Sequence, residues 1–405
     1  MGKPKILSVS DLLGFARLAA EGAEGVTGMV ARMHHAVLDT PGLAQLAPAV
    51  SRKIPKMVYQ TLGAAFRLTA QGAGVASALI DDNEVLPLSW GRETAVAALN
   101  GVVGDHLATT NNPLALPMRF RANGHTLALE REALAQALPS VTGKVVVLVH
   151  GLAMSDLHWT RANHDHGAAL ARDFGYTPVY LSYNTGLHIS TNGRAFAEAL
   201  ERLVAAWPVE IEDLLLLGYS MGGLVTRSAC LASEASAHAW RKKLSKLVFL
   251  GTPHHGAPLE RIGNWVGNVL ADAPYAAALA PLAKIRSAGV TDLRYGAIAD
   301  EDWSGRDRFA HAPDARRPAP LPEKVACYAI AATLSASPGT PKDLLIGDGL
   351  VPVASALGRH RTQALKFAPD RQWIACATGH LDLLSSPAVY KRIAAWLEQD
   401  SLISP

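Results

Sequence analysis

Residues 214–223 read Leu-Leu-Leu-Leu-Gly-Tyr-Ser-Met-Gly-Gly, four leucines followed at once by the pattern Gly-x-Ser-x-Gly. A continuous apolar run is typical of a strand buried on both faces. Gly218 and Gly222 allow a sharp turn from strand to helix that holds the serine between them in strained backbone angles. We therefore predict that Ser220 is a nucleophile at the carboxyl edge of a sheet, rather than part of a merely structural turn. The helix that begins at Met221 favours a developing oxyanion through its dipole.

Further strands and helices alternate on both sides of this stretch. Asn123-Gly124 predicts a hairpin between residues 118–121 and 126–130. Apolar runs separated by helical stretches favour an α/β fold, a doubly wound and mostly parallel sheet. The runs are residues 144–149, 178–181, 214–217, 247–250, 325–331 and 373–377, and the helical stretches are 160–173, 190–207, 221–233 and 388–398.

The chain divides near residue 113 into an N-terminal helical segment, residues 1–113, and a catalytic domain, residues 114–405. Apolar residues spaced by threes and fours predict helices before the division, the third of them over 94–107. Residues 256–322 are rich in Ala and Pro and interrupt the alternation, so we expect an inserted lid or cap.

Composition excludes several classes of protein. The 405 residues are 49% hydrophobic with a formal net charge of +3, which is typical of a globular protein and argues against a nucleic-acid partner. Three dispersed cysteines indicate neither a disulfide framework nor a zinc pattern. We expect a cytoplasmic protein, because the N-terminus is a poor signal peptide and no apolar run is long enough to span a membrane. Peripheral contact of residues 1–113 with a membrane or lipid surface stays open as an alternative to packing on the catalytic domain.

A serine needs a base to take its proton near neutral pH. His380 follows the last apolar strand and precedes the last helix, which is where the base lies if the chain order is Ser, acid, His. His254 and His255 follow an earlier strand and are expected to shape the pocket floor or a loop instead.

The acid that orients the histidine must lie within reach of it. Asp348, in a glycine-flanked loop between Ser220 and His380 in the sequence, is the best candidate, and Asp343 is the second. Asp382 lies too close to His380 along the chain to turn back toward it.

An oxyanion hole needs two backbone N–H groups that converge on one oxygen atom. Met221 supplies one, because it follows the nucleophile, and Leu152 in His150-Gly151-Leu152 supplies the other. We interpret His150 as a brace for this loop rather than as the catalytic base.

Together these motifs resemble the bacterial lipase/esterase branch of the α/β-hydrolases, over roughly residues 117–400. The resemblance implies the α/β-hydrolase fold, and it implies that Asp348 and His380 complete a triad with Ser220. Asp382 matches a calcium-ligand position of some secreted lipases, but without a partner aspartate no metal is predicted. The motifs are Val149-His150-Gly151, Gly218-Tyr219-Ser220-Met221-Gly222-Gly223-Leu224-Val225, Gly251-Thr252-Pro253-His254, Asp348-Gly349-Leu350-Val351 and Gly379-His380-Leu381-Asp382.

The predicted function is serine carboxylic ester hydrolysis, as in an esterase or lipase, through an acyl-enzyme. The substrate is expected to be a small-molecule or lipid ester with an apolar acyl group, and no cofactor is needed. We expect Tyr219, His254 and Trp265 to contact the substrate. A thioesterase, an amidase or an acyltransferase would use the same triad. An alternative from another class is a non-catalytic scaffold that binds lipid.

Overall fold

The computed structural model describes residues 14, 17–18, 90–258, 261–263, 286–308, 313–314, 316–337 and 345–403. The chain forms two compact units, Met1–Ser89 with Leu107–Ala115, and Trp90–His106 with Leu116–Pro405. In the first unit, Asn112 Nδ2 donates to the carbonyl oxygen of Gly14 over 3.1 Å. The first two predicted helices lie almost wholly outside the described residues.

The third predicted helix is confirmed and extends over α3 (Trp90–Thr109). Its first 17 residues, Trp90–His106, group with the second unit, so part of the expected N-terminal segment belongs to the unit that carries the sheet. The expected boundary near residue 113 stays a prediction, because so little of residues 1–89 is described.

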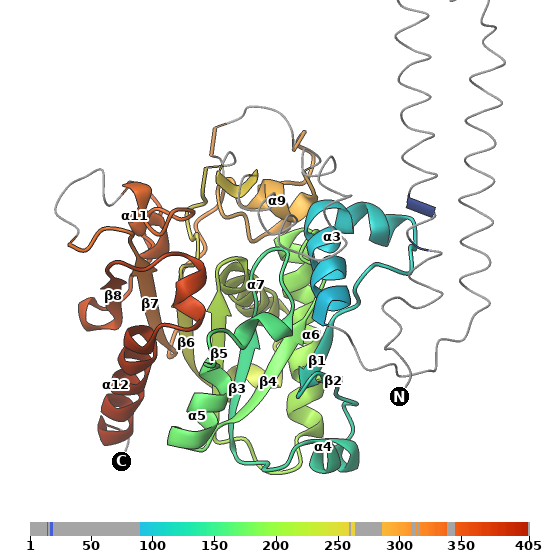
Figure 1. The fold of residues 1–405 in the computed structure, drawn as a ribbon, viewed down its shortest axis with the longest axis vertical. Helices are drawn as coiled ribbons and strands as arrows, with labels where there is room; N and C mark the ends of the chain where they lie inside the picture. Colours follow the sequence, from blue (N-terminus) through green and yellow to red (C-terminus); the bar gives the residue numbers. More distant parts are fainter. Residues whose placement is uncertain are drawn as a thin grey trace, which may run out of the picture. The chain divides into compact units, whose positions relative to one another are not determined.

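The second unit is built on one twisted sheet with the order β2-β1-β4-β3-β5-β6-β7-β8 (Figure 1). Strands β3 to β8 are parallel, and the β1–β2 hairpin lies antiparallel at the edge. The hairpin turns at Asn123 and Gly124, which both have positive φ, as the Asn-Gly pair predicts. The strands are β1 (Arg119–Ala122), β2 (His125–Thr126), β3 (Lys144–Val149), β4 (Thr177–Ser182), β5 (Asp213–Tyr219), β6 (Leu244–Leu250), β7 (Ala326–Ala332) and β8 (Gln372–Ala375).

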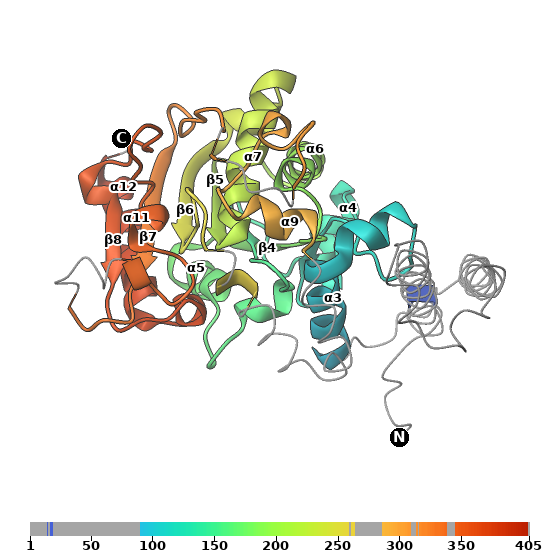
Figure 2. The same ribbon diagram turned by 90° about the horizontal axis from the view of Figure 1, so that it is seen from above.

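Helices cover both faces of the sheet, which explains why the strands are apolar throughout. In Figure 2, α6 and α7 lie on one side of the sheet and α5 on the other. Side chains of α5 and α12, including Leu170 and Trp396, share a buried cluster with Leu148 and Leu217 of the central strands. The main helices are α5 (His166–Phe174), α6 (Ile189–Ala206), α7 (Met221–Ser236) and α12 (Pro387–Ile403).

Two features differ from the sequence expectation. The helix predicted over 160–173 begins only at His166, because Asp165 caps it by accepting a hydrogen bond from Ala168 N, and a turn with positive φ at Ala162 and Asn163 precedes it. Short elements were not predicted at all. They are α4 (Arg131–Ala137), α9 (Ala288–Asp292), α11 (Val353–Ala356), η2 (Asp156–Trp159), η3 (Ala239–Lys242), η5 (Asp300–Asp302), η6 (Pro369–Arg371) and η7 (Leu381–Leu384).

The sheet order reverses between β3 and β5. The chain goes from β3 outward to β4 on one side and, after returning, from β5 outward to β6 on the other. Loops at the carboxyl ends of such neighbouring strands separate and leave room for a ligand. The loop after β3 and the turn after β5, where the sequence predicts the oxyanion hole and the nucleophile, flank this point.

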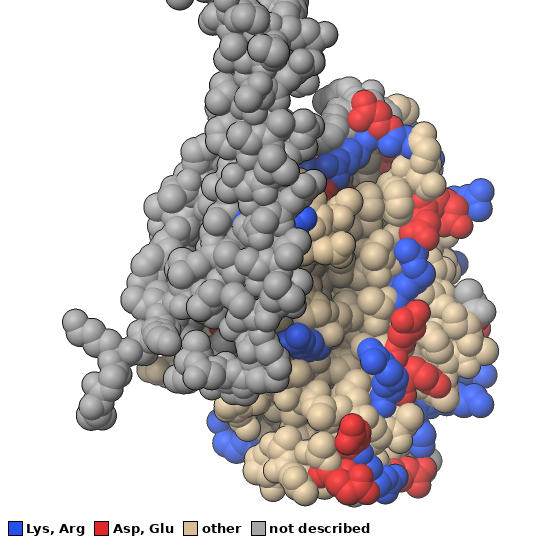
Figure 3. Space-filling model, turned by 90° about the vertical axis from the view of Figure 1, so that its right-hand side faces the viewer, with Lys and Arg blue, Asp and Glu red and all other residues tan. Residues whose placement is uncertain are grey.

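One face of the described part of the chain shows no single dominant charge. On the face in Figure 3, acidic and basic side chains of the described residues alternate without a large patch of one sign, consistent with the small net charge of +3. Among the described residues, no helix combines the length and the apolar character that a membrane span requires. The connection between β6 and β7 contains residues 256–322, and their role as a lid stays a prediction.

Candidate active site

Ser220 lies in the turn between β5 and α7, with φ 52° and ψ −124°. This left-handed backbone conformation is rare for a residue with a side chain and indicates local strain. Gly222 makes the turn possible, since a Cβ there would come 2.1 Å from the carbonyl oxygen of Val149. Gly218 does the same on the other side, where a Cβ would lie 2.6 Å from Gly223 Cα. The two glycines are thus required by close backbone approach.

A chain of hydrogen bonds joins the three residues predicted as nucleophile, base and acid. His380 Nε2 lies 2.9 Å from Ser220 Oγ, and His380 Nδ1 lies 2.7 Å from Asp348 Oδ2. All three residues are buried, so water competes little for these bonds. With Asp348 ionised, Nδ1 carries the hydrogen and the free lone pair of Nε2 faces the serine hydroxyl, the arrangement that a general base requires.

Backbone donors hold Asp348 in place. Its Oδ1 accepts from Leu350 N over 3.0 Å and from Val351 N over 2.8 Å, which leaves Oδ2 for the histidine. The Asp348 carbonyl oxygen also accepts from His380 N over 3.1 Å. The loop after β7 and the loop after β8 are therefore joined through both the backbone and the side chain of Asp348. The second candidate acid, Asp343, lies outside the described residues.

The loop predicted to form the oxyanion hole lies directly beside the serine. A Cβ on Gly151 would be 3.1 Å from Ser220 Cβ, so only glycine fits there without a shift. Leu152 is the next residue, and Met221 N–H is one of the free donors of the first turn of α7. Thr185 Oγ1 accepts from Ala153 N over 3.0 Å and fixes the far end of the loop.

His150 is a buried brace, in agreement with the sequence interpretation. Its ring stacks on Tyr183 at 4.5 Å, and Tyr183 Oη donates to the His150 carbonyl oxygen over 2.8 Å. Burial lowers the pKa of His150 to about 3, so the ring is neutral near pH 7. Tyr183 and Thr185 were missed in the sequence, because nothing in the local pattern after β4 signals bonds to a loop after β3.

Two residues predicted to contact substrate have other neighbours in the structure. Tyr219 is fully buried and donates from Oη to the His380 carbonyl oxygen over 3.1 Å. His254 is also fully buried, with its ring against Phe249 and its Nδ1 3.5 Å from Arg227 Nη1. In the structure, Tyr219 therefore contacts His380, and His254 lies beside Arg227. The third predicted contact, Trp265, lies outside the described residues.

The connection between β6 and β7 brings α9 close to the loop that is predicted to form the oxyanion hole. A Cβ on Gly289 would lie 2.1 Å from the carbonyl oxygen of Thr185 and 3.2 Å from Met221 Cε. Asp292 at the end of α9 accepts from Ile189 N and lies 3.1 Å from His188 Nδ1. Through these contacts, α9 packs on the start of α6 and beside the first residue of α7.

The acidic residue next to the base has a structural role. Asp382 Oδ2 accepts from Gly379 N over 3.0 Å and closes the turn that carries His380. Within the described residues, no three His, Cys, Asp or Glu side chains gather as metal ligands would. The geometry of Asp382 therefore matches its exclusion from the triad in the sequence analysis.

Comparison with known proteins gives one family match. A family model described as the PGAP1-like alpha/beta domain matches residues 140–316, a range that contains Leu152 and Ser220. No curated protein matches this sequence.

Solved structures of low sequence identity are also similar. They include the mature form of a Bacillus licheniformis lipase (20% identity, 64% of this chain and 93% of that chain, TM-score 0.39). Aspergillus fumigatus lipase B has 14% identity, with 66% of this chain, 57% of that chain and a TM-score of 0.37. The Pyrococcus furiosus esterase Pf2001 has 14% identity, with 64% of this chain, 81% of that chain and a TM-score of 0.36.

The assignment of the fold rests on the sheet and on the family match. A mostly parallel sheet with an antiparallel edge hairpin, helices on both faces and a sharp turn at Ser220 agrees with the fold class expected from the sequence. The matched domain covers β3 to β6 of this sheet. The chain has the α/β-hydrolase fold, and its residues 140–316 are similar to the PGAP1-like alpha/beta domain.

Proposed function

We propose that the protein is a serine carboxylic ester hydrolase of the esterase or lipase type. The observation that carries this proposal is the hydrogen-bonded series Ser220–His380–Asp348 at the carboxyl edge of the sheet, with the serine in a strained turn. A turn with a purely structural role needs neither a buried histidine bonded to the serine hydroxyl nor a carboxylate bonded to that histidine. A nucleophile that reacts near neutral pH needs both.

The reaction proceeds in two stages. Ser220 Oγ attacks the ester carbonyl carbon as its proton passes to His380 Nε2, and Asp348 stabilises the imidazolium that forms. The carbonyl oxygen becomes an oxyanion that accepts from the N–H groups of Leu152 and Met221, each contributing about 3 kcal/mol. The alcohol then leaves with the proton from Nε2. Water, deprotonated by the same nitrogen, releases the acid and restores the serine.

An apolar acyl group is the substrate class that we favour. Leu152 belongs to the loop beside Ser220, and Leu383 Cδ1 lies close to Gly251, as does the His380 ring, so buried apolar residues accompany both the loop and the base. Peripheral contact of residues 1–113 with a lipid surface remains a separate proposal, which binding of the whole chain to vesicles would test.

The test is hydrolysis of nitrophenyl esters of increasing acyl length by the wild type and by Ser220→Ala. We expect the variant to lose about 10⁴-fold or more in kcat. Ser233→Ala is the matched control, because Ser233 is also a buried serine of α7 but donates to the Cys230 carbonyl oxygen. It should keep full activity.

Each outcome separates the proposals. The chain-length optimum distinguishes an esterase from a lipase, and thioester and amide analogues of the best acyl group test the alternative leaving groups. An active Ser220→Ala variant would refute the nucleophile. A wild type that turns over none of these substrates would favour the non-catalytic scaffold.

A further inference from the structure

Arg227 is a buried cation without a counter-ion in the described part of the chain. It lies on α7 two turns after Ser220 and is 7% exposed. Its Nη2 donates to the Ala319 carbonyl oxygen over 2.6 Å, and its Nη1 lies 3.5 Å from His254 Nδ1. Its Nε has no hydrogen-bond partner, and within the described residues no carboxylate oxygen lies within 4.0 Å of the guanidinium.

A second donor beside it also lacks an acceptor. His254 is fully buried, and its Nε2 has no partner. Since the arginine can only donate, His254 Nδ1 is the acceptor of the contact between them, and Nε2 therefore carries the hydrogen of the neutral ring. Burial and the charge of Arg227 hold the pKa of His254 well below its usual value, in agreement with a neutral ring.

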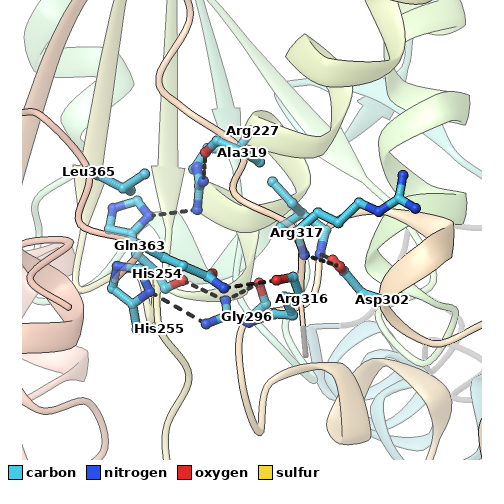
Figure 4. Close-up of a pocket in the computed structure, with 11 residues that line it drawn as sticks. Arg227, His254, His255, Gly296, Asp302, Arg316, Arg317, Ala319, Gln363 and Leu365 are labelled. Carbon is cyan, nitrogen blue, oxygen red and sulfur yellow. Dashed lines mark hydrogen bonds between the residues drawn. The ribbon is translucent and has the colours of Figure 1, made fainter. Parts of the chain in front are cut away.

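These groups line a small pocket of about 20 Å³ that opens to solvent. Figure 4 shows the guanidinium groups of Arg227 and Arg316 near the rings of His254 and His255, whereas the side chain of Arg317 extends away from them. Arg316 forms an ion pair with Asp314 at 2.8 Å and lies 3.5 Å from His255 Nδ1. This pair is close to neutral, and the charges of Asp302 and Arg317, which also line the pocket, offset one another, so one positive charge on the pocket wall is left unbalanced.

A buried, unpaired guanidinium is costly, because desolvation is repaid only when a charge or good acceptors replace water. Burial and the neighbouring charge of Arg316 lower the pKa of Arg227 to about 10, which leaves it cationic near pH 7. The unbalanced cation on the pocket wall is what an anion would satisfy, whereas Arg227 Nε and His254 Nε2 are enclosed beneath the pocket surface. An arginine that served only to donate to the Ala319 carbonyl oxygen would leave this charge unexplained.

We infer that this pocket binds a compact oxyanion, a phosphate group that is either free or part of a small phosphomonoester. The planar fork of arginine matches the oxygen spacing of phosphate, and such charge-assisted bonds are stronger than neutral ones. The site shares no side chain with the proposed triad, since Arg227 lies about 10 Å along α7 from Ser220. The inference therefore goes beyond ester hydrolysis and does not depend on it.

The test is thermal unfolding of the full chain in inorganic phosphate, against chloride of equal ionic strength. Binding to the folded state raises the unfolding midpoint as ligand concentration grows. We expect the wild type to gain about 3 °C or more at saturation. Glycerol 3-phosphate in place of phosphate separates the two sources of the group, since a larger shift with the ester indicates a phosphomonoester site.

Arg227→Met should abolish the phosphate-dependent shift, whereas Arg172→Met should keep it. Arg172 is an exposed arginine of α5, paired with Asp173 outside the pocket. A wild type that responds no more to phosphate than to chloride would overturn the inference. So would an Arg227→Met variant that keeps the full response.

A second pair of variants tests the site without removing Arg227, whose Nη2 also donates to the Ala319 carbonyl oxygen. Leu365 lines the same pocket. Leu365→Glu places a carboxylate there, so it should raise the midpoint in phosphate-free buffer and abolish the phosphate response. Leu365→Gln is equal in size but neutral and should keep the response. If the Glu and Gln variants respond alike, the pocket is not an anion site.

Discussion

At the scale of single residues, Asp348 is held through both its side chain and its backbone. One carboxylate oxygen accepts two backbone N–H groups, the other accepts from His380, and the carbonyl oxygen accepts from His380 N. The base and the acid are therefore fixed relative to one another before any substrate binds. This preorganisation is where the electrostatic contribution to catalysis comes from.

Asp348→Asn tests this assignment. The amide can occupy the same space, but it favours the wrong histidine tautomer, and we expect kcat for ester hydrolysis to fall by about 10⁴-fold. Asp382→Asn is the matched control, because Asp382 lies close to His380 in sequence but its carboxylate accepts from Gly379 N instead of the imidazole. It should lose about tenfold or less, the cost of a weakened turn. Equal losses in the two variants would remove Asp348 from the triad.

At the residue scale, the sequence offers candidates wherever a motif has a recognisable spacing. Ser220, Asp348 and His380 were each named from the residues beside them, and the structure brings all three within hydrogen-bond distance. Tyr183 and Thr185 could not be found in this way, because their contacts join loops that are about 30 residues apart in sequence. The burial of Tyr219 and His254 could not be foreseen for the same reason, and their contact with substrate stays a prediction.

At the scale of secondary structure, the decisive element is the turn from β5 to α7. It stores strain at Ser220, and it persists because the strand and the helix on either side are deeply packed. The predicted strands were confirmed with shifts of a few residues, because a continuous run of apolar residues marks a strand that is buried on both faces. Short elements such as α9 were not, because one helical turn depends on tertiary contacts, here a cap at Ser287 and the close approach of Gly289 to Thr185.

Gly222→Ala should damage this element. Its Cβ would lie 2.1 Å from the Val149 carbonyl oxygen, so either the turn or β3 must move. We expect at least a 100-fold fall in kcat, because a misplacement of about 1 Å is enough for that loss. The unfolding midpoint should fall by several degrees, about 1–3 kcal/mol of stability.

Gly263→Ala is the control for Gly222→Ala. Among the described residues, a Cβ at Gly263 meets nothing within 4 Å, so the variant should match the wild type in both activity and midpoint. Wild-type activity in Gly222→Ala would show that the turn tolerates a side chain. Close backbone approach would then not be the reason for the glycine pattern around Ser220.

At the scale of the whole molecule, buried neutral histidines make the protein sensitive to acid. Burial lowers the pKa of His150 to about 3 and those of His158 and His166 to about 4, from 6.5. Below pH 6.5 the unfolded chain therefore binds more protons than the folded one. Stability is lost as the pH falls from 6.5 toward 4, at about 1–2 kcal/mol per histidine by pH 5.

Urea unfolding followed by circular dichroism at about pH 7 and about pH 5 checks this prediction. The midpoint should be clearly lower at the acidic pH. His158→Asn should reduce the difference, because it removes one of the groups that protonate on unfolding, whereas replacement of the exposed His125 by Asn should not. Burial raises the pKa values of Asp156 and Asp292 and so acts in the opposite direction. A midpoint that is equal at both pH values would contradict the prediction.

The central claim is that Ser220 is an activated nucleophile, and the most direct measurement is covalent labelling by a fluorophosphonate followed by peptide mass spectrometry. We predict one adduct per chain, on the peptide that contains Ser220. It should be absent in Ser220→Ala. It should form far more slowly in Asp348→Asn, because the wrong tautomer of His380 carries its hydrogen on Nε2 and cannot take the serine proton. An unlabelled protein, under conditions that fully label a reference serine hydrolase, or an adduct at another residue would contradict the claim.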